Sequence, residues 1–118
     1  MRRSHLPSES VLTAADLRLD RVQRLVERAG SRIELTGKEF SLLEYLMLNA
    51  GRRVTRSMII EHVWNLTFDT TTNVVDVYIN YLRRKIDDGH PIKVIHTVRG
   101  VGYELSGPSD VPTVEAGI

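Results

Sequence analysis

The segment from about Thr72 to Asp87 places its large aliphatic residues on one narrow stripe of a helix, and this feature constrains the fold more than any other. These residues recur at the spacing of one side of a helix that turns about 100° per residue: Val75, Ile79, Leu82 and Ile86. Other elements have to cover such a stripe. The pattern therefore predicts a helix with one face buried in the core of a globular domain.

The opposite side of this predicted helix carries groups that can read base edges. It holds Asn73, Val77, Asn80, Tyr81 and Arg84, with Asp76 and Arg83 on one flank and Tyr78 on the other. An amide can pair with adenine, a guanidinium with guanine, and a valine methyl can meet the thymine methyl. A helix of about 15 residues is about 22 Å long and fits the major groove of duplex DNA, which is about 12 Å wide.

A merely solvated face is the alternative interpretation of this side of the helix. Val77 and Tyr81 stand where a solvated helix more often carries Glu or Lys. The two residues favour a recognition helix over a solvated one.

Two β-rich runs follow the helix, Lys93 to Val98 and Val101 to Leu105, and Arg99-Gly100 separates them. This order predicts a hairpin, because glycine permits the positive φ of a tight reversal. Arg99 at the tip can lie in a minor groove or on a phosphate, although an ordinary exposed turn arginine is equally compatible. The glycines do not form a nucleotide-binding loop, since no helix follows them.

The segments before this helix predict further helices and short strands. Thr36-Gly37-Lys38-Glu39 is a capping box, which predicts a helix whose stripe is Phe40, Leu43, Met47 and Ala50 and whose end is Gly51. A short strand or turn at 53–55, a helix from about Arg56 to Trp64, and a loop from Asn65 to Thr71 come next. The uneven apolar pieces between Leu12 and Leu35 indicate three or four short antiparallel strands.

This order of elements predicts an α+β winged helix-turn-helix. It comprises a small N-terminal antiparallel sheet, three helices and a C-terminal β-hairpin wing. We expect one domain over residues 12–105, with a flexible linker at 1–11 and a flexible tail at 106–118, because both ends are rich in Ser, Pro or Gly.

Composition narrows the functional classes. The net charge is only +1, but the stretch from Arg52 to Glu104 holds eight Lys or Arg against six acids, so the basic character is local. The chain has no Cys, which excludes disulfides and thiolate metal sites and suits a reducing cytoplasm. No apolar run approaches the roughly 20 residues that cross a bilayer, and no signal peptide is expected.

Neither a metal site nor an enzyme is expected. The four histidines, His5, His62, His90 and His96, are scattered without partners at ligand spacing. No nucleophile motif or P-loop is present, so no cofactor is predicted. Trp64 is most simply a buried anchor, and packing there leaves its indole N–H able to meet a phosphate.

Several stretches in this order resemble the C-terminal effector domain of OmpR/PhoB-type two-component response regulators. They are Leu35 to Leu43, Glu61-His62-Val63-Trp64, Thr72 to Ile79, Leu82 to Asp87 and Ile95 to Tyr103. The resemblance spans about Leu12 to Leu105, and the sequence of these motifs is most similar to the branch often described as heavy-metal-responsive. It implies double-stranded DNA binding for transcription regulation, in a cytoplasmic phosphorelay.

The resemblance also implies roles for individual residues. Helix 72–86 would read the major groove, hairpin 95–105 would be the wing, and loop 65–71 would touch RNA polymerase. Phosphate contacts would fall on Arg56, Trp64, Val74 through its backbone, Tyr78, Arg83, Thr97 and Tyr103. Base contacts would fall on Asn73 and Asn80, with Arg99 in the minor groove.

The chain departs from the family in two respects. Many relatives carry Arg-Arg in place of Asn80-Tyr81, and often Arg in place of Asn73, which predicts a different operator. The receiver domain with its phosphoacceptor is missing from the sequence, and the opening stretch resembles an interdomain linker. We therefore expect a fragment of a longer regulator that acts as a dimer on direct repeats once phosphorylated.

Two other functions fit a winged helix. A protein-interaction module would carry acids or large hydrophobic residues on the outer face of the third helix, where Asn73, Asn80 and Arg84 stand. RNA binding is the other alternative, although the major groove of A-form RNA excludes a helix.

Overall fold

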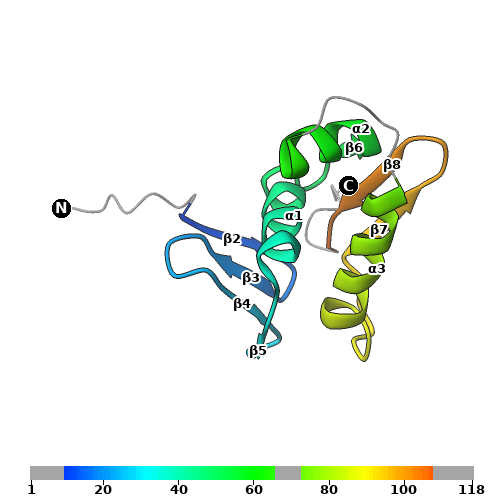
Figure 1. The fold of residues 1–118 in the computed structure, drawn as a ribbon. Helices are drawn as coiled ribbons and strands as arrows, with labels where there is room; N and C mark the ends of the chain where they lie inside the picture. Colours follow the sequence, from blue (N-terminus) through cyan, green and yellow to red (C-terminus); the bar gives the residue numbers. More distant parts are fainter. Residues whose placement is uncertain (1–9, 66–72, 108–118) are drawn as a thin grey trace, which may run out of the picture.

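The computed structural model describes residues 10–65 and 73–107, and it confirms an α+β winged helix. Four strands come first: β2 (Val11–Ala14), β3 (Leu17–Asp20), β4 (Leu25–Arg28) and β5 (Ser31–Ile33). Next come α1 (Gly37–Leu48), β6 (Arg53–Thr55), α2 (Arg56–Ile59), η2 (Ile60–Trp64) and α3 (Asn73–Ile86). The hairpin β7 (Ile95–Val98) and β8 (Gly102–Leu105) follows. Figure 1 shows the N-terminal sheet on one side of α1, and α3 with the hairpin on the other.

The N-terminal sheet is an antiparallel meander in the order β2-β3-β4-β5, so four strands form where three or four were predicted. Leu19 of β3 pairs with Leu12 on one side and with Val26 on the other. Leu17, Leu19 and Val26 are buried, whereas Arg18 between the leucines is exposed. This alternation gives the sheet one apolar face, which packs on the helices.

Helix α1 begins as its capping box predicts. The Thr36 hydroxyl accepts a hydrogen bond from the Glu39 N–H, and the Glu39 carboxylate accepts one from the Thr36 N–H. The helix ends at Leu48 with Asn49 as its cap, three residues before Gly51, where the sequence predicted its end. Buried side chains also occupy more of the helix than the predicted stripe, since α1 lies between the sheet and α3.

Glu39 connects the start of α1 to α3. Its buried carboxylate also accepts a hydrogen bond from Lys85 of α3, at 2.7 Å. Burial opposes the charged form, but the hydrogen bonds from Lys85 and Thr36 and the positive charge of Lys85 outweigh it and lower the pKa of Glu39. An ionised Glu39 therefore stabilises the packing of the two helices.

The predicted helix from Arg56 to Trp64 is present, but its second half is wider than an α-helix. Thr55 caps α2 by accepting a hydrogen bond from Met58 N–H, and residues 60–64 form one π-helical turn. The segment ends at Asn65, whose φ of 61° is left-handed. The rest of the predicted loop, and with it the expected RNA polymerase contact, lies outside the described residues.

The second sheet has the order β6-β8-β7, so residues 53–55 form a strand rather than a turn and extend the predicted hairpin. Gly102 lies in β8 rather than in the turn, and its lack of a side chain permits this pairing. A Cβ atom at Gly102 would lie 2.1 Å from the Val54 carbonyl oxygen, so no other residue fits without moving β6. Gly100 supplies the reversal itself, with a φ of 76°.

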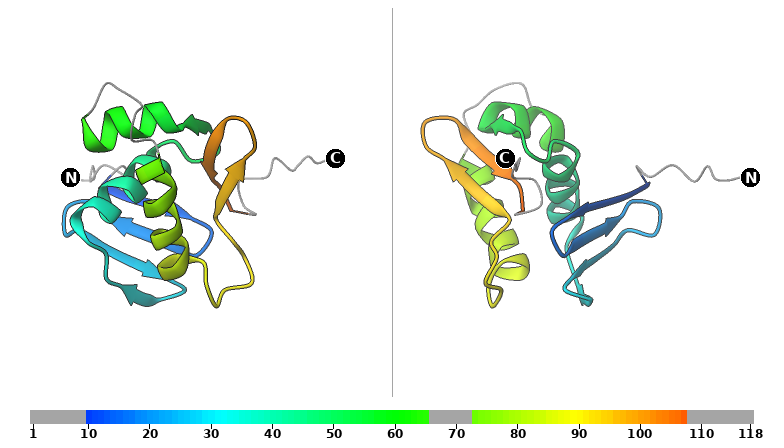
Figure 2. Two further views of the ribbon diagram at one scale, coloured as in Figure 1. Left: turned by 45° about the vertical axis from the view of Figure 1, so that its right-hand side comes forward. Right: turned by 180° about the vertical axis from the view of Figure 1, so that it is seen from behind.

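Among the described residues, regular contacts continue just outside the range 12–105 that the sequence predicts for the domain. Val11 already belongs to β2, and the N–H of Ser106 donates to the carbonyl of Val94. The buried core is contributed by the N-terminal sheet, α1, the α2–η2 segment, α3 and the second sheet. Figure 2 shows from two further sides that the hairpin lies beside α3 and away from the N-terminal sheet. No helix in residues 10–65 and 73–107 is long and apolar enough to cross a membrane.

Candidate nucleic-acid interface

Helix α3 has the two faces that the sequence predicts. Its inner side chains, Val75, Ile79, Leu82 and Ile86, have no exposed surface. The residues predicted for its outer face are all exposed: Asn73, Val77, Asn80, Tyr81 and Arg84. Val77 and Tyr81 remain 41% and 40% exposed, although both are large and hydrophobic. The outer face is thus free for a ligand and mixes amide, guanidinium and apolar groups.

An aromatic row runs from the end of η2 onto α3. The ring centres of Trp64 and Tyr78 lie 5.2 Å apart, edge to face, and those of Tyr78 and Tyr81 lie 5.3 Å apart in a similar arrangement. Trp64 is half-buried, and the ammonium of Lys38 lies 5.9 Å from its ring centre. The row connects η2 to α3, and Trp64 packs against the core while remaining half-buried, where the sequence predicted a buried anchor.

A polar cluster on the opposite flank of α3 joins three elements around Asp76. The carboxylate of Asp76 accepts a hydrogen bond from Nε of Arg56 in α2 at 2.8 Å, and another from the hydroxyl of Tyr103 in β8. The Arg56 guanidinium also lies 5.3 Å from the centre of the Tyr103 ring. This arrangement ties the helix-turn-helix to the wing.

The pKa shifts in this cluster follow from the same contacts. Burial opposes ionisation of Asp76, but the hydrogen bonds from Tyr103 and Arg56 and the charge of Arg56 lower its pKa below the ordinary range. Burial, the hydrogen bond to Asp76 and the charge of Asp76 raise the pKa of Tyr103. The hydrogen bond to Asp76 raises the pKa of Arg56. At neutral pH the cluster is an ion pair with a neutral phenol.

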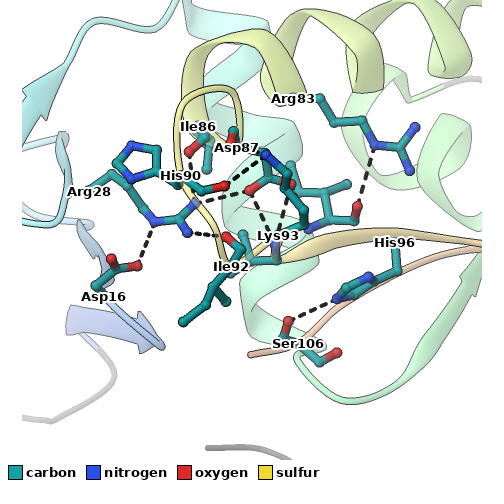
Figure 3. Close-up of polar contacts among 12 residues, drawn as sticks. Asp16, Arg28, Arg83, Ile86, Asp87, His90, Ile92, Lys93, His96 and Ser106 are labelled. Atoms are coloured by element: carbon teal, nitrogen blue, oxygen red, sulfur yellow. Dashed lines mark hydrogen bonds and ion pairs between the residues drawn. The ribbon is translucent and has the colours of Figure 1, made fainter. Parts of the chain in front are cut away.

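Arg83 joins α3 to the first strand of the wing. Its guanidinium donates to the Thr97 hydroxyl at 2.6 Å and to the Ile95 carbonyl at 3.4 Å. It also lies 5.6 Å from the centre of the Tyr103 ring. Figure 3 shows Arg83 reaching from α3 toward β7. Arg83, Thr97 and Tyr103, which the resemblance assigns to phosphates, are therefore neighbours.

The tip of the wing presents Arg99 to solvent. Arg99 and Gly100 are exposed in the turn, which a hydrogen bond from Val101 N–H to the Val98 carbonyl closes. Figures 1 and 2 show this turn at the same end of the molecule as the start of α3. Asn73 and Arg99 therefore lie toward the same end of the interface.

The structure brings the predicted site residues together in three groups. The outer face of α3 holds Asn73, Val77, Asn80, Tyr81 and Arg84; the aromatic row holds Trp64 and Tyr78; the polar flank holds Arg56, Arg83, Thr97 and Tyr103. Val74 is half-buried at the start of α3, and Arg99 stands apart at the wing tip. Tyr103 differs most from its predicted role, because it is 4% exposed and its hydroxyl is already bonded to Asp76.

Sequence reasoning missed two functional or structural residues. The helical pattern places Asp76 on a flank of the helix but assigns it no role. The available signal is its position seven residues before Arg83, which puts both side chains on one side of the helix. No motif singles out Arg28, although it lies two residues after the inward-facing Val26 in the same strand. No group of three or more metal-ligating side chains occurs among the residues that the structure describes.

Comparison with known proteins places this interface in a family. A sequence model described as "Transcriptional regulatory protein, C terminal" matches residues 30–105. The transcriptional regulatory protein PcoR of Escherichia coli is 50% identical over 105 residues, which are 89% of this chain and 46% of that protein. The response regulator MprA of Mycobacterium avium is 54% identical over 100 residues, 83% of this chain and 43% of that protein. The chain thus spans less than half the length of these relatives.

Solved structures agree with the sequence comparison. The DNA-binding domain of RstA from Klebsiella pneumoniae, solved in complex with the RstA box, has a TM-score of 0.74 and 31% identity, and the match covers 81% of this chain and 96% of that one. The DNA-binding domain of CpxR from Escherichia coli has a TM-score of 0.69 and 32% identity, over 81% of this chain and 95% of that one. With the family match over most of the folded part, these likenesses show that the chain belongs to the C-terminal effector domains of OmpR/PhoB-type response regulators, the winged-helix domains that bind DNA to regulate transcription.

Proposed function

We propose that this domain inserts α3 into the major groove of an operator and reads it with Asn73, Asn80 and Arg84. The observation that carries the proposal is the outer face of α3, which is exposed along its length and has no carboxylate on its centre line. Amides two turns apart, with a guanidinium one turn further on, match the donors and acceptors of base edges. As a member of a family of DNA-binding regulator domains, the chain is not an enzyme, in agreement with the sequence analysis.

The polar flank and the wing supply the contacts to the DNA backbone in this proposal. Arg56 uses only its Nε toward Asp76, so other guanidinium N–H groups remain for a phosphate. Arg83 and Thr97 stand next to each other on the same side, and the aromatic row positions Trp64 and Tyr78 on the other flank. Arg99 at the wing tip would enter the minor groove, where a narrow groove concentrates negative potential.

The role of the whole regulator is inferred from its relatives. We infer that the domain works in a cytoplasmic two-component system, as a dimer on DNA, under a receiver domain that a phosphorelay controls. The response-regulator relatives, of which the chain spans less than half, support this inference. Contact of the segment 65–71 with RNA polymerase is part of the same proposal.

The test begins with selection of preferred duplexes from a random pool by the 118-residue chain. We expect a defined operator, and affinity for it that falls with salt by about 0.9 log units per log unit of salt for each phosphate neutralised. Asn80→Ala should relax preference at one or two base pairs, because a lost bidentate amide removes discrimination. Its thermal stability should stay within about 0.5 kcal/mol of the wild type.

Arg18→Ala is the matched control, because Arg18 is exposed on the N-terminal sheet, across α1 from α3. It should leave sequence preference unchanged. Binding that does not depend on salt would rule out this placement of α3. The same holds if Asn80→Ala leaves the operator preference intact at every position. Preference for duplex RNA in competition would point to the RNA-binding alternative.

A further inference from the structure

Asp76 is the single carboxylate of α3, and it stands on the flank where the phosphate-binding groups gather. The helix sequence from Asn73 to Ile86 otherwise carries only the cations Arg83, Arg84 and Lys85. A carboxylate facing a polyanion is repelled by it, so its presence at this place needs an explanation. The helix dipole favours an acidic side chain in the first turn, but this explains only why an aspartate is tolerated at position 76.

The contacts of Asp76 show what the carboxylate does in the free domain. It accepts hydrogen bonds from Arg56 and Tyr103, two of the side chains that the resemblance assigns to phosphates. Its charge cancels that of Arg56 within a 2.8 Å contact, and its position holds the guanidinium against the Tyr103 ring. Asp76 thus engages Nε of Arg56 and the hydroxyl of Tyr103, neutralises the Arg56 charge, and keeps both side chains in place at the interface.

We propose that Asp76 is a specificity-determining residue, whose carboxylate weakens binding to all DNA but weakens it least on the operator. The inference rests on the proposed function above. On non-operator DNA, binding depends mainly on positive charge, so one neutralised arginine lowers affinity directly. On the operator, α3 sits at one fixed depth, and an Arg56 already held in position binds its phosphate without first losing side-chain freedom.

The proposal separates the charge of Asp76 from its geometry. Asp76→Asn removes the charge and keeps the size of the side chain, so the positive charge of Arg56 is no longer neutralised and attracts a phosphate on any sequence. Asp76→Glu keeps the charge but moves the carboxylate by one methylene. The first variant should change non-operator binding, whereas the second should mainly disturb the fixed position of Arg56 on the operator.

The experiment measures dissociation constants on the selected operator and on a scrambled duplex over a range of salt. For Asp76→Asn we expect non-operator affinity to rise on the order of 3- to 10-fold, as for one added charge near a phosphate. The salt slope on that DNA should steepen by about 0.9. Operator affinity should rise less or fall, so the ratio of operator affinity to non-operator affinity drops. Asp76→Glu should restore non-operator affinity to the wild-type value.

Glu34→Gln is the matched control, since it removes the same charge from an exposed side chain next to the N-terminal sheet. It should alter both affinities little and equally. If Glu34→Gln and Asp76→Asn change non-operator binding equally, only net charge matters and the proposal is wrong. If Asp76→Asn weakens both duplexes equally while the domain still melts cooperatively, Asp76 is a structural residue and the proposal is again overturned.

The design also distinguishes this inference from the function on which it rests. A wild-type domain that binds operator and scrambled duplex equally overturns the proposed function, and with it the role of Asp76. A wild-type domain that discriminates, together with an Asp76→Asn variant of unchanged ratio, overturns the inference about Asp76 alone.

Discussion

Replacing Arg28 with methionine should cost the domain a large part of its stability, because this arginine links the N-terminal sheet to the end of α3. Arg28 ends β4 and is only 1% exposed. Its guanidinium donates to the Ile86 carbonyl at 2.7 Å, to the Asp87 carboxylate at 3.0 Å, and to the Ile92 carbonyl, while Nε pairs with Asp16. Figure 3 shows Arg28 between Asp16 and the end of α3.

The magnitude follows from what the variant leaves behind. Removing one partner of a buried ion pair costs about 3–5 kcal/mol, because the remaining charge is buried without compensation. Asp87 is 3% exposed, but it still accepts hydrogen bonds from the N–H groups of Val94 and Ile95. Asp16 is 43% exposed and returns to water. The loss should therefore lie near the lower limit, about 3 kcal/mol, or roughly 12–24 °C in Tm for a domain of this size.

Denaturant unfolding followed by the fluorescence of the single tryptophan, Trp64, provides the assay. Arg32→Met is the matched control on the neighbouring strand β5, since the Arg32 side chain is 62% exposed. That variant should stay within about 0.5 kcal/mol of the wild type. A loss below about 1 kcal/mol for Arg28→Met would refute the reasoning, since it would mean that the guanidinium is solvated rather than buried.

Three further variants test other parts of the fold. Leu82→Ala should lower the free energy of unfolding by roughly 2–5 kcal/mol, because Leu82 has no exposed surface; a smaller loss in thermal melts would contradict the inner stripe of α3. Gly102→Ala should cost more than about 1 kcal/mol and expose the β8 amides to hydrogen exchange, since its Cβ would meet the Val54 carbonyl; unchanged protection would disprove the close approach. Glu39→Gln should destabilise the domain at neutral pH. Because folding lowers the pKa of Glu39, its contribution to the free energy of unfolding is full above its ordinary pKa of about 4.3 and is lost as the pH falls through the folded value. The stabilities of the variant and the wild type should therefore converge in acid. A difference in stability that persists in acid would argue against an ionised Glu39.

The features that sequence predicted best are those whose signals lie within a few residues. The stripe of α3, the capping box at Thr36 and Glu39, and the hairpin around Gly100 each depend on side chains one turn apart or less. Their physical causes are local hydrogen bonding and the period of a helix or strand. For the same reason, helical spacing alone assigns the exposed residues of α3 to its outer face.

The features that sequence did not predict depend on partners far along the chain. Arg28 is held by Asp87, and Asp76 by Arg56 and Tyr103, and none of these pairs is visible in a local pattern. The sequence predicts an ordinary helix where residues 60–64 form a π-helical turn, because an apolar stripe does not reveal a widened turn. The buried state of Tyr103 likewise follows from distant partners, since its hydroxyl donates to Asp76 and the guanidinium groups of Arg56 and Arg83 lie near its ring.

The pairing of β6 with β8 has a consequence for the order in which the domain assembles. The N-terminal meander joins strands that are neighbours in sequence, so it closes only short loops. Strand β6 precedes α2 and α3, whereas its partner β8 follows them, so this contact closes a loop that contains both helices. During synthesis from the N-terminus, β6 has no sheet partner until β8 has left the ribosome. The wing therefore completes the domain last, and the polar cluster that links Tyr103 to Asp76 forms only at that final step.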